Sequence, residues 1–123
     1  MSMKHDHIYA YSEEILVRIG EGELNVDNII GSWEELFDNG MITEDLKGVI
    51  NDLSNCQLKL DPESFEILMQ YLKQNPLLKR LKLAVVCDSP QNIVFPMMAE
   101  EGESELKVKS FSTMEAAVQW IRF

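Results

Sequence analysis

The chain of 123 residues has the length of one domain, and its shares of apolar (46%) and charged (26%) side chains are those of a folded protein. Its net charge of −10 argues against nucleic acid and anionic membranes as partners, because both would be repelled. Two cysteines without a CxxC motif, no secretory signal and no apolar run of membrane-spanning length predict a cytoplasmic protein with reduced thiols.

The N-terminal part predicts a β-hairpin followed by a helix. Residues 7–11 and 14–20 are rich in β-branched and aromatic side chains, and the second segment alternates as a strand near a sheet edge does. Apolar residues then recur at helical spacing over residues 26–38. Asn25 is suited to cap this helix, and Asn39-Gly40 is suited to end it.

The middle of the chain predicts a strand, a crossover helix and a second strand. The first strand spans residues 48–53, and the second, residues 81–87, is apolar on both faces. Between them, Asp61 as N-cap with Pro62 at the first helical position marks a helix start, and Asn75-Pro76 marks its end. Because such a unit pairs its strands in parallel, the sequence predicts an α/β domain.

The last third predicts a short helix, a loop, a strand and a final helix. The short helix is expected within residues 93–101, the acidic loop over 100–105 and the strand over 106–111. Ser112 with Glu115 forms a capping-box pattern for the last helix. The predicted order is ββαβαβαβα in one domain, residues 1–123, with a mixed β-sheet covered by helices. The side chains expected to face inward from the last helix are Met114, Ala117, Val118 and Ile121.

No motif of high specificity for catalysis occurs. The sequence has no Gly-rich phosphate loop, no GxSxG and no HExxH, so we predict no enzyme. His5 and His7 would place two imidazoles on one face of a strand, but terminal histidines are commonly incidental. We therefore predict no metal and no cofactor.

Carboxylates at strand ends suggest a binding crevice. Asp52 closes the third predicted strand and Asp88 closes the fourth, and ligands usually bind outside the carboxyl ends of parallel strands. The alternative is local, because Asp61 caps a helix and Ser54-Asn55 and Asp88-Ser89 are suited to shape turns. The candidate binding residues are Asp52, Ser54, Asp61, Ser64, Asp88 and Ser89.

Several large apolar side chains have two interpretations. Phe95, Met97 and Met98 follow the fourth strand and favour either core filling or a plastic binding surface. Trp33 lies in the apolar stripe of the first helix and is expected in the core. Trp120 lies off the stripe of the last helix, which favours a partner surface such as a homodimer contact.

The element order and the C-terminal segment resemble the SpoIIAA-like group of small bacterial domains, which are similar to the STAS domains of anti-anti-sigma factors. In that group a last strand, a Phe, a capping Ser or Thr and an "EEAxxWL"-type helix close the chain, and Asp52-Leu53 matches a middle pattern near a strand end. The resemblance implies a mixed sheet with helices packed against it. The matching C-terminal residues are Phe111, Thr113, Glu115, Ala116, Ala117, Trp120 and Ile121.

The resemblance also concerns phosphorylation. Anti-anti-sigma factors carry a phosphorylatable serine directly after an aspartate at the start of the second helix. Here Asp61 matches, but Pro62 occupies the serine position and no glycine follows Ser64, so we predict no serine switch of that kind.

The sequence and the resemblance support two hypotheses for the function. The first, implied by the resemblance, is a non-enzymatic protein-interaction or regulatory module with an unidentified protein partner. The alternative is binding or sensing of a small apolar, lipid-like ligand, because SpoIIAA-like domains are similar in fold to lipid-binding CRAL-TRIO domains. A third, an enzyme using Asp52, Asp88 or Cys87, is the least favoured.

Overall fold

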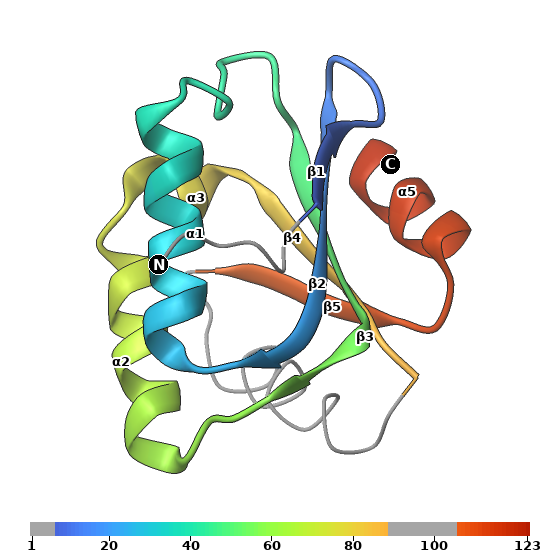
Figure 1. The fold of residues 1–123 in the computed structure, drawn as a ribbon. Helices are drawn as coiled ribbons and strands as arrows, with labels where there is room; N and C mark the ends of the chain where they lie inside the picture. Colours follow the sequence, from blue (N-terminus) through green and yellow to red (C-terminus); the bar gives the residue numbers. More distant parts are fainter. Residues whose placement is uncertain (1–6, 89–105) are drawn as a thin grey trace.

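The computed structural model describes residues 7–88 and 106–123, and within them five strands form one sheet in the order β1-β2-β3-β4-β5 (Figure 1). β1 and β2 form the predicted antiparallel hairpin, and each later strand runs parallel to the one before it. The sheet is therefore mixed, as predicted. The strands are β1 (His7–Ala10), β2 (Ile15–Leu24), β3 (Gly48–Leu58), β4 (Lys82–Val86) and β5 (Lys107–Phe111).

Helices cover both faces of the sheet (Figure 1). α1 (Val26–Asp38), α2 (Pro62–Lys73) and α3 (Pro76–Arg80) lie on one face, and α5 (Met114–Arg122) lies on the other. Because β2, β3 and β4 follow one another across the sheet, crossovers of one hand bring α1 and α2 to the same face.

The pairing of the two central strands confirms the expectation on which the fold prediction depended. Val49 lies beside Leu83, and Asp52 lies beside Val86, in a parallel register. The capping predictions for two helices are also confirmed. The side chain of Asn25 accepts a hydrogen bond from the backbone N–H of Asn28 at 2.8 Å, which closes the start of α1.

β3 is longer than predicted, because it does not end at residue 53. Gly20 of β2 stands opposite both Leu53 and Ser54, which is a β-bulge, and pairing then resumes from Glu21 with Asn55 to the ends of both strands. The prediction that Ser54-Asn55 shapes a turn is wrong, since β3 continues through both residues: Asn55 pairs with Glu21, while the N–H of Ser54 donates to Oδ1 of Asp52 at 3.0 Å. Beyond the bulge both strands bend toward α1 and α2 (Figure 1).

Two details near the helices differ from the prediction. α2 ends at Lys73, just before Asn75-Pro76 as predicted, but a further short helix that was not predicted, α3, begins at Pro76, because proline is well suited to a first helical position. The N-cap of α5 is Thr113, whose Oγ1 accepts from the N–H of Ala116 at 3.2 Å, so the Ser112–Glu115 capping box is wrong by one residue. The helix predicted within residues 93–101 and the loop over 100–105 lie outside the described residues.

Alternate residues of the strands feed two main cores, one on each face of the sheet, and Leu24, Cys56 and Leu58 form a third, small cluster. On the α5 side, strand and helix residues form a cluster in which every member is at most 5% exposed. On the other side, a larger cluster includes Trp33, confirming its predicted place in the core. The α5-side cluster is Ile15, Val17, Ile50, Ala84, Val86, Ala117, Val118 and Ile121. The α1/α2-side cluster is Leu16, Trp33, Leu36, Leu46, Val49, Met69, Leu72, Leu78, Leu81, Leu83 and Leu106.

Candidate ligand pocket

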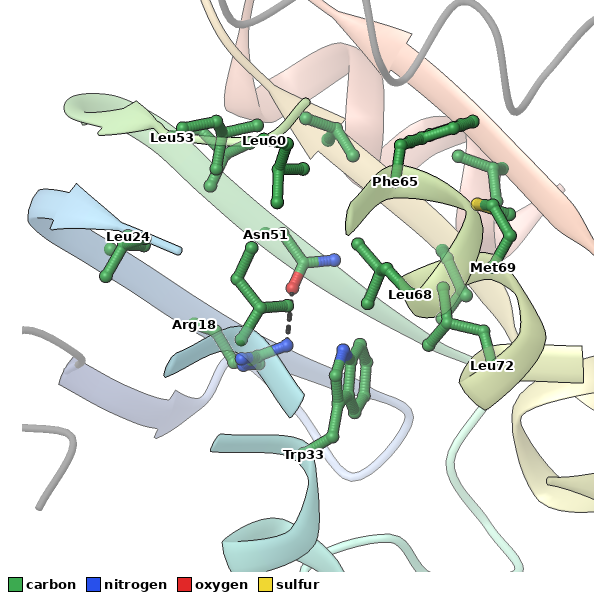
Figure 2. A pocket seen from close by; sticks show the side chains of 16 residues that line it. Arg18, Leu24, Trp33, Asn51, Leu53, Leu60, Phe65, Leu68, Met69 and Leu72 are labelled. Carbon is green, nitrogen blue, oxygen red and sulfur yellow. Dashed lines mark hydrogen bonds between the residues drawn. The ribbon is translucent and has the colours of Figure 1, made fainter. Parts of the chain in front are cut away.

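A pocket of about 120 Å³ lies between the sheet and the helices α1 and α2 (Figure 2). Its walls are mainly leucine and aromatic side chains, with one arginine and one asparagine among them. The lining residues are Arg18, Gly20, Leu24, Ile29, Trp33, Asn51, Leu53, Leu58, Leu60, Phe65, Leu68, Met69, Leu72, Leu83, Val85 and Val108.

One wall of the pocket is the inner face of α2. Phe65, Leu68, Met69 and Leu72 recur at the three- and four-residue spacing that places side chains on one side of a helix. The start of this helix is fixed by Asp61, whose Oδ1 accepts from the N–H of Ser64 at 2.7 Å. The cap therefore sets where the wall of the pocket begins.

A second wall comes from the bent ends of β2 and β3. Leu24 and Leu58 are the last residues of these strands, and Leu60 follows in the connection to α2. Their main chains meet, because the N–H of Lys59 donates to the carbonyl of Leu24 at 2.8 Å. The bulge thus contributes to the pocket, because it curls the sheet over one end of it.

The polar end of the pocket is built around Arg18, which is only 7% exposed. Its Nη1 donates to Oδ1 of Asn51 at 2.9 Å, and its Nη2 donates to Oγ of Ser32 at 2.6 Å. The guanidinium also lies 4.3 Å from the centre of the Trp33 ring, within the range of a cation–π interaction. Figure 2 shows the guanidinium beside the indole, with its hydrogen bond to Asn51 drawn as a dashed line.

The surroundings of Arg18 are themselves held in place. Nδ2 of Asn51 donates to the backbone carbonyl of Ala84 at 3.2 Å, which ties the amide to the neighbouring strand. Ser32 is fully buried in α1, one residue before Trp33. Both of these side-chain acceptors are neutral, and they orient the guanidinium at this end of the pocket. The pocket therefore combines an apolar body with a fixed cation.

None of the described candidate binding residues from the sequence lines this pocket. Asp52 lies within β3, where its Oδ1 accepts from the N–H of Ser54 at 3.0 Å. Asp88 is exposed just after β4. It follows two residues after Val86, the residue of β4 that pairs with Asp52. Asp61 and Ser64 stand at the start of α2, and Ser89 lies outside the described residues.

These candidates fall into two groups rather than one crevice. Asp52 pairs with Val86, the last residue of β4, so Asp52 lies near the C-terminal end of that strand. In Figure 1 the start of α2 lies at the lower left, whereas the end of β4 lies at the lower right. Asp61 performs the capping role that its local interpretation predicted, and its hydrogen bonds from Ser64 hold the pKa of its carboxyl below the usual value.

The thiol beside Asp88 is poorly suited to chemistry. Cys87 is 2% exposed, and burial together with the nearby charge of Asp88 raises the pKa of its thiol. A raised pKa disfavours the thiolate, which is the reactive form. Both cysteines, Cys56 and Cys87, are free and buried.

The other apolar candidates are placed as follows. Trp120 is half-buried, and its ring lies 5.6 Å from that of Phe111, while Nζ of Lys82 donates to the Trp120 carbonyl at 2.8 Å. Phe95, Met97 and Met98 lie outside the described residues.

The sequence interpretation missed the pocket, although two signals for it were present. Arg18 interrupts an apolar strand between Val17 and Ile19, and Asn51 interrupts the next strand after Ile50. A charged or amide side chain inside an apolar strand is unusual unless it has buried partners. The two positions are paired neighbours in the sheet.

The described residues contain neither a cluster of metal-ligating side chains nor a helix that could span a membrane. No three His, Cys, Asp or Glu side chains in that part of the chain are grouped as metal ligands would be. Across the same residues, every helix is too short or too polar to cross a membrane.

Comparison with known proteins finds a likeness in fold alone. Neither family models nor curated proteins match this sequence. A solved structure of an uncharacterized DUF3478-family protein with a SpoIIAA-like fold, from Shewanella loihica PV-4, is similar with a TM-score of 0.64 and 13% identity, covering 94% of this chain and 91% of that one.

SpoIIAA itself is similar as well. The anti-sigma factor antagonist SpoIIAA in its unphosphorylated form gives a TM-score of 0.56 at 15% identity, over 95% of this chain and 97% of that chain. The phosphorylated form of this Bacillus cell fate determinant gives a TM-score of 0.56 at 14% identity, over 95% and 99% of the two chains. The likeness covers the hairpin, the parallel strands and the covering helices, and so the chain has the SpoIIAA-like fold that its C-terminal segment indicated.

Proposed function

We propose that the protein is a non-enzymatic, STAS-like regulatory or protein-interaction module. The observation that carries this proposal is the fold, which is shared over 95% of the chain with SpoIIAA, an anti-sigma factor antagonist. The description of SpoIIAA as an anti-sigma factor antagonist names another protein as its target. Two buried, free thiols agree with work in the reducing cytoplasm.

The contact surface in this proposal is the outer side of α2 with its N-terminal end. Ile67 is a large apolar side chain on α2 that is 50% exposed, and Glu63 and Glu66 beside it are exposed too. An apolar side chain ringed by charges is typical of the centre of a contact patch. The residues proposed to take part are Asp61 and Ser64 here, with Asp52, Ser54, Asp88 and Ser89 as a second contact region.

The experiment is affinity capture from native extract with the full chain and two variants. Ile67→Glu places a charge at the centre of the proposed surface, and Phe123→Glu makes the same change at the last residue, which is 89% exposed. We expect a protein captured in roughly 1:1 amount by wild type and by Phe123→Glu and lost with Ile67→Glu. Absence of any stoichiometric partner, together with a monomer in sedimentation, would contradict the proposal.

Self-association is the second outcome of the same sedimentation measurement. The half-buried Trp120 next to Phe111 and the edge strand β5 are the features that support a homodimer. In that case the dimer should dissociate in Trp120→Ala.

The pocket favours a second candidate, binding of a small apolar ligand. The fold comparison does not bear on it, and it rests on the apolar lining alone. Native mass spectrometry of gently purified protein should show a retained small molecule. Leu68→Trp, which fills the pocket, should lose this molecule. Ile67→Trp, the same change one residue earlier on the exposed side of α2, should keep it. Protein without any bound molecule in all three samples would count against this candidate.

A further inference from the structure

The volume of the pocket limits the size of what it holds. An engineered apolar cavity of about 150 Å³ takes a benzene molecule, so a pocket of about 120 Å³ has room for a body of roughly six non-hydrogen atoms. A long-chain lipid needs several times this space. The lipid-like ligand suggested by the resemblance is therefore too large for the pocket as it stands.

The chemistry of the pocket limits the head group of the ligand. Arg18 and Asn51 bring polar side-chain groups to a lining that is otherwise nearly all apolar, and both lie on adjacent strands. Arginine stays charged at every accessible pH, and its planar guanidinium with five N–H donors matches the geometry of a carboxylate. Contact with Trp33 and Ser32 holds this group at one end of the pocket.

We infer that the pocket binds a small monocarboxylate with a compact branched or cyclic apolar body, the carboxylate against Arg18 and Asn51 and the body against the inner face of α2. The inference rests on the ligand-binding candidate above and specifies its ligand class. A carboxylate gains charge-assisted hydrogen bonds that a neutral ligand of equal shape does not gain. Phe65, Leu68 and Leu72 supply the apolar contacts.

The test compares three probes with the full chain: isovalerate, its neutral amide isovaleramide, and benzene. Binding is followed by NMR chemical-shift changes, with the indole N–H of Trp33 as the reporter inside the pocket. We expect isovalerate to bind about tenfold more tightly than isovaleramide, because the two differ mainly in charge. Benzene should bind as well, because the body of the pocket is apolar.

Variants at two arginines complete the experiment. Arg18→Met keeps an unbranched side chain of similar reach without the charge, and it should abolish the preference for isovalerate over isovaleramide while benzene still binds. Arg122→Met is the matched control, since Arg122 is exposed on α5 at the other face of the sheet, and it should leave all three affinities unchanged.

The outcomes separate the two levels of the proposal. Binding of benzene with no preference for isovalerate would overturn the carboxylate inference and leave the ligand pocket in place. Failure of all three probes would overturn both. If Arg18→Met does not fold, the preference between isovalerate and isovaleramide in the wild-type protein decides the question alone.

Discussion

The two faces of the sheet differ in how they are filled, although both are built by alternate residues of the same strands. On the α5 face, Ile15, Val17 and Ile50 meet Ala117 and Ile121 in a cluster where every member is at most 5% exposed. On the α1/α2 face the neighbouring strand positions 16, 18, 49 and 51 also point at helices, but there a pocket remains.

The difference shows what the second face is suited to do. On the α5 face, strand and helix side chains are almost fully buried against one another, and we expect this half to be the stable base of the fold. The α1/α2 face accepts a buried arginine and an asparagine, which cost free energy to bury and need partners. Residues that lower stability without an evident structural need commonly serve binding.

The largest expected effect is the loss of stability caused by a cavity on the α5 face. Ile121→Ala removes a side chain that is 2% exposed, and we expect unfolding free energy to fall by about 4 kcal/mol. Leu68→Ala removes a half-buried side chain that already borders the pocket, so the loss should be about 1 kcal/mol. Urea denaturation of both variants measures this. Equal losses would show that the two faces are filled alike.

The second prediction concerns added volume. Gly48 lies where β3 meets α5, and a Cβ there would come within 2.7 Å of the carbonyl oxygen of Lys82 and 2.8 Å of Cγ2 of Ile121. Because the carbonyl is part of the sheet backbone, we expect Gly48→Ala to cost about 3 kcal/mol.

The matched control for Gly48 is Gly31 in α1. A Cβ at Gly31 meets nothing within 4 Å, and alanine is the better helix former, so Gly31→Ala should raise stability by about 1 kcal/mol. Thermal unfolding of both alanine variants gives the comparison. A Gly48→Ala protein as stable as wild type would contradict close packing of the α5 face.

The smallest effect concerns the cap that positions α2 and its pocket wall. The pKa of Asp61 is lowered from 3.8 by its hydrogen bonds from Ser64, so the folded state favours the carboxylate. Its contribution is complete well above pH 3.8 and is lost as pH falls through the lower, folded-state pKa. The urea midpoint of Asp61→Ala should therefore lie below that of wild type at pH 7, and the gap should close in acid.

Asp61→Asn separates the charge from the hydrogen bond. Its amide oxygen still caps the helix but does not titrate, so its gap to Asp61→Ala should stay the same at all pH values. A gap between wild type and Asp61→Ala that did not change with pH would show that the carboxylate charge is not involved.

The sequence predicted the parts of the fold that depend on local signals. Asp61-Pro62 marked the start of α2, and the apolar segment around Val85 marked a central strand. The bulge was missed, because pairing of Asn55 with Glu21 is a long-range effect without a local signature. α3 was missed because Pro76 was taken as an end, although proline also starts helices.

The candidate site was predicted less well, for a physical reason. The predicted site consists of acidic and hydroxyl side chains near strand ends, whereas the pocket lies over the middle of the sheet. Its size depends on how far α2 stands from β3, which no residue pattern encodes. Arg18 was visible as a charge inside an apolar strand, but its contacts with Asn51 and Ser32 bridge elements far apart in sequence.

The most direct test of the contrast between the two faces is a crystal structure of the protein under xenon pressure, because xenon enters apolar cavities that water leaves empty. We expect xenon beside Leu68, Phe65 and Trp33, between the sheet and α2, and none between the sheet and α5. Xenon between α5 and the sheet, or a filled α2 face without xenon, would contradict it.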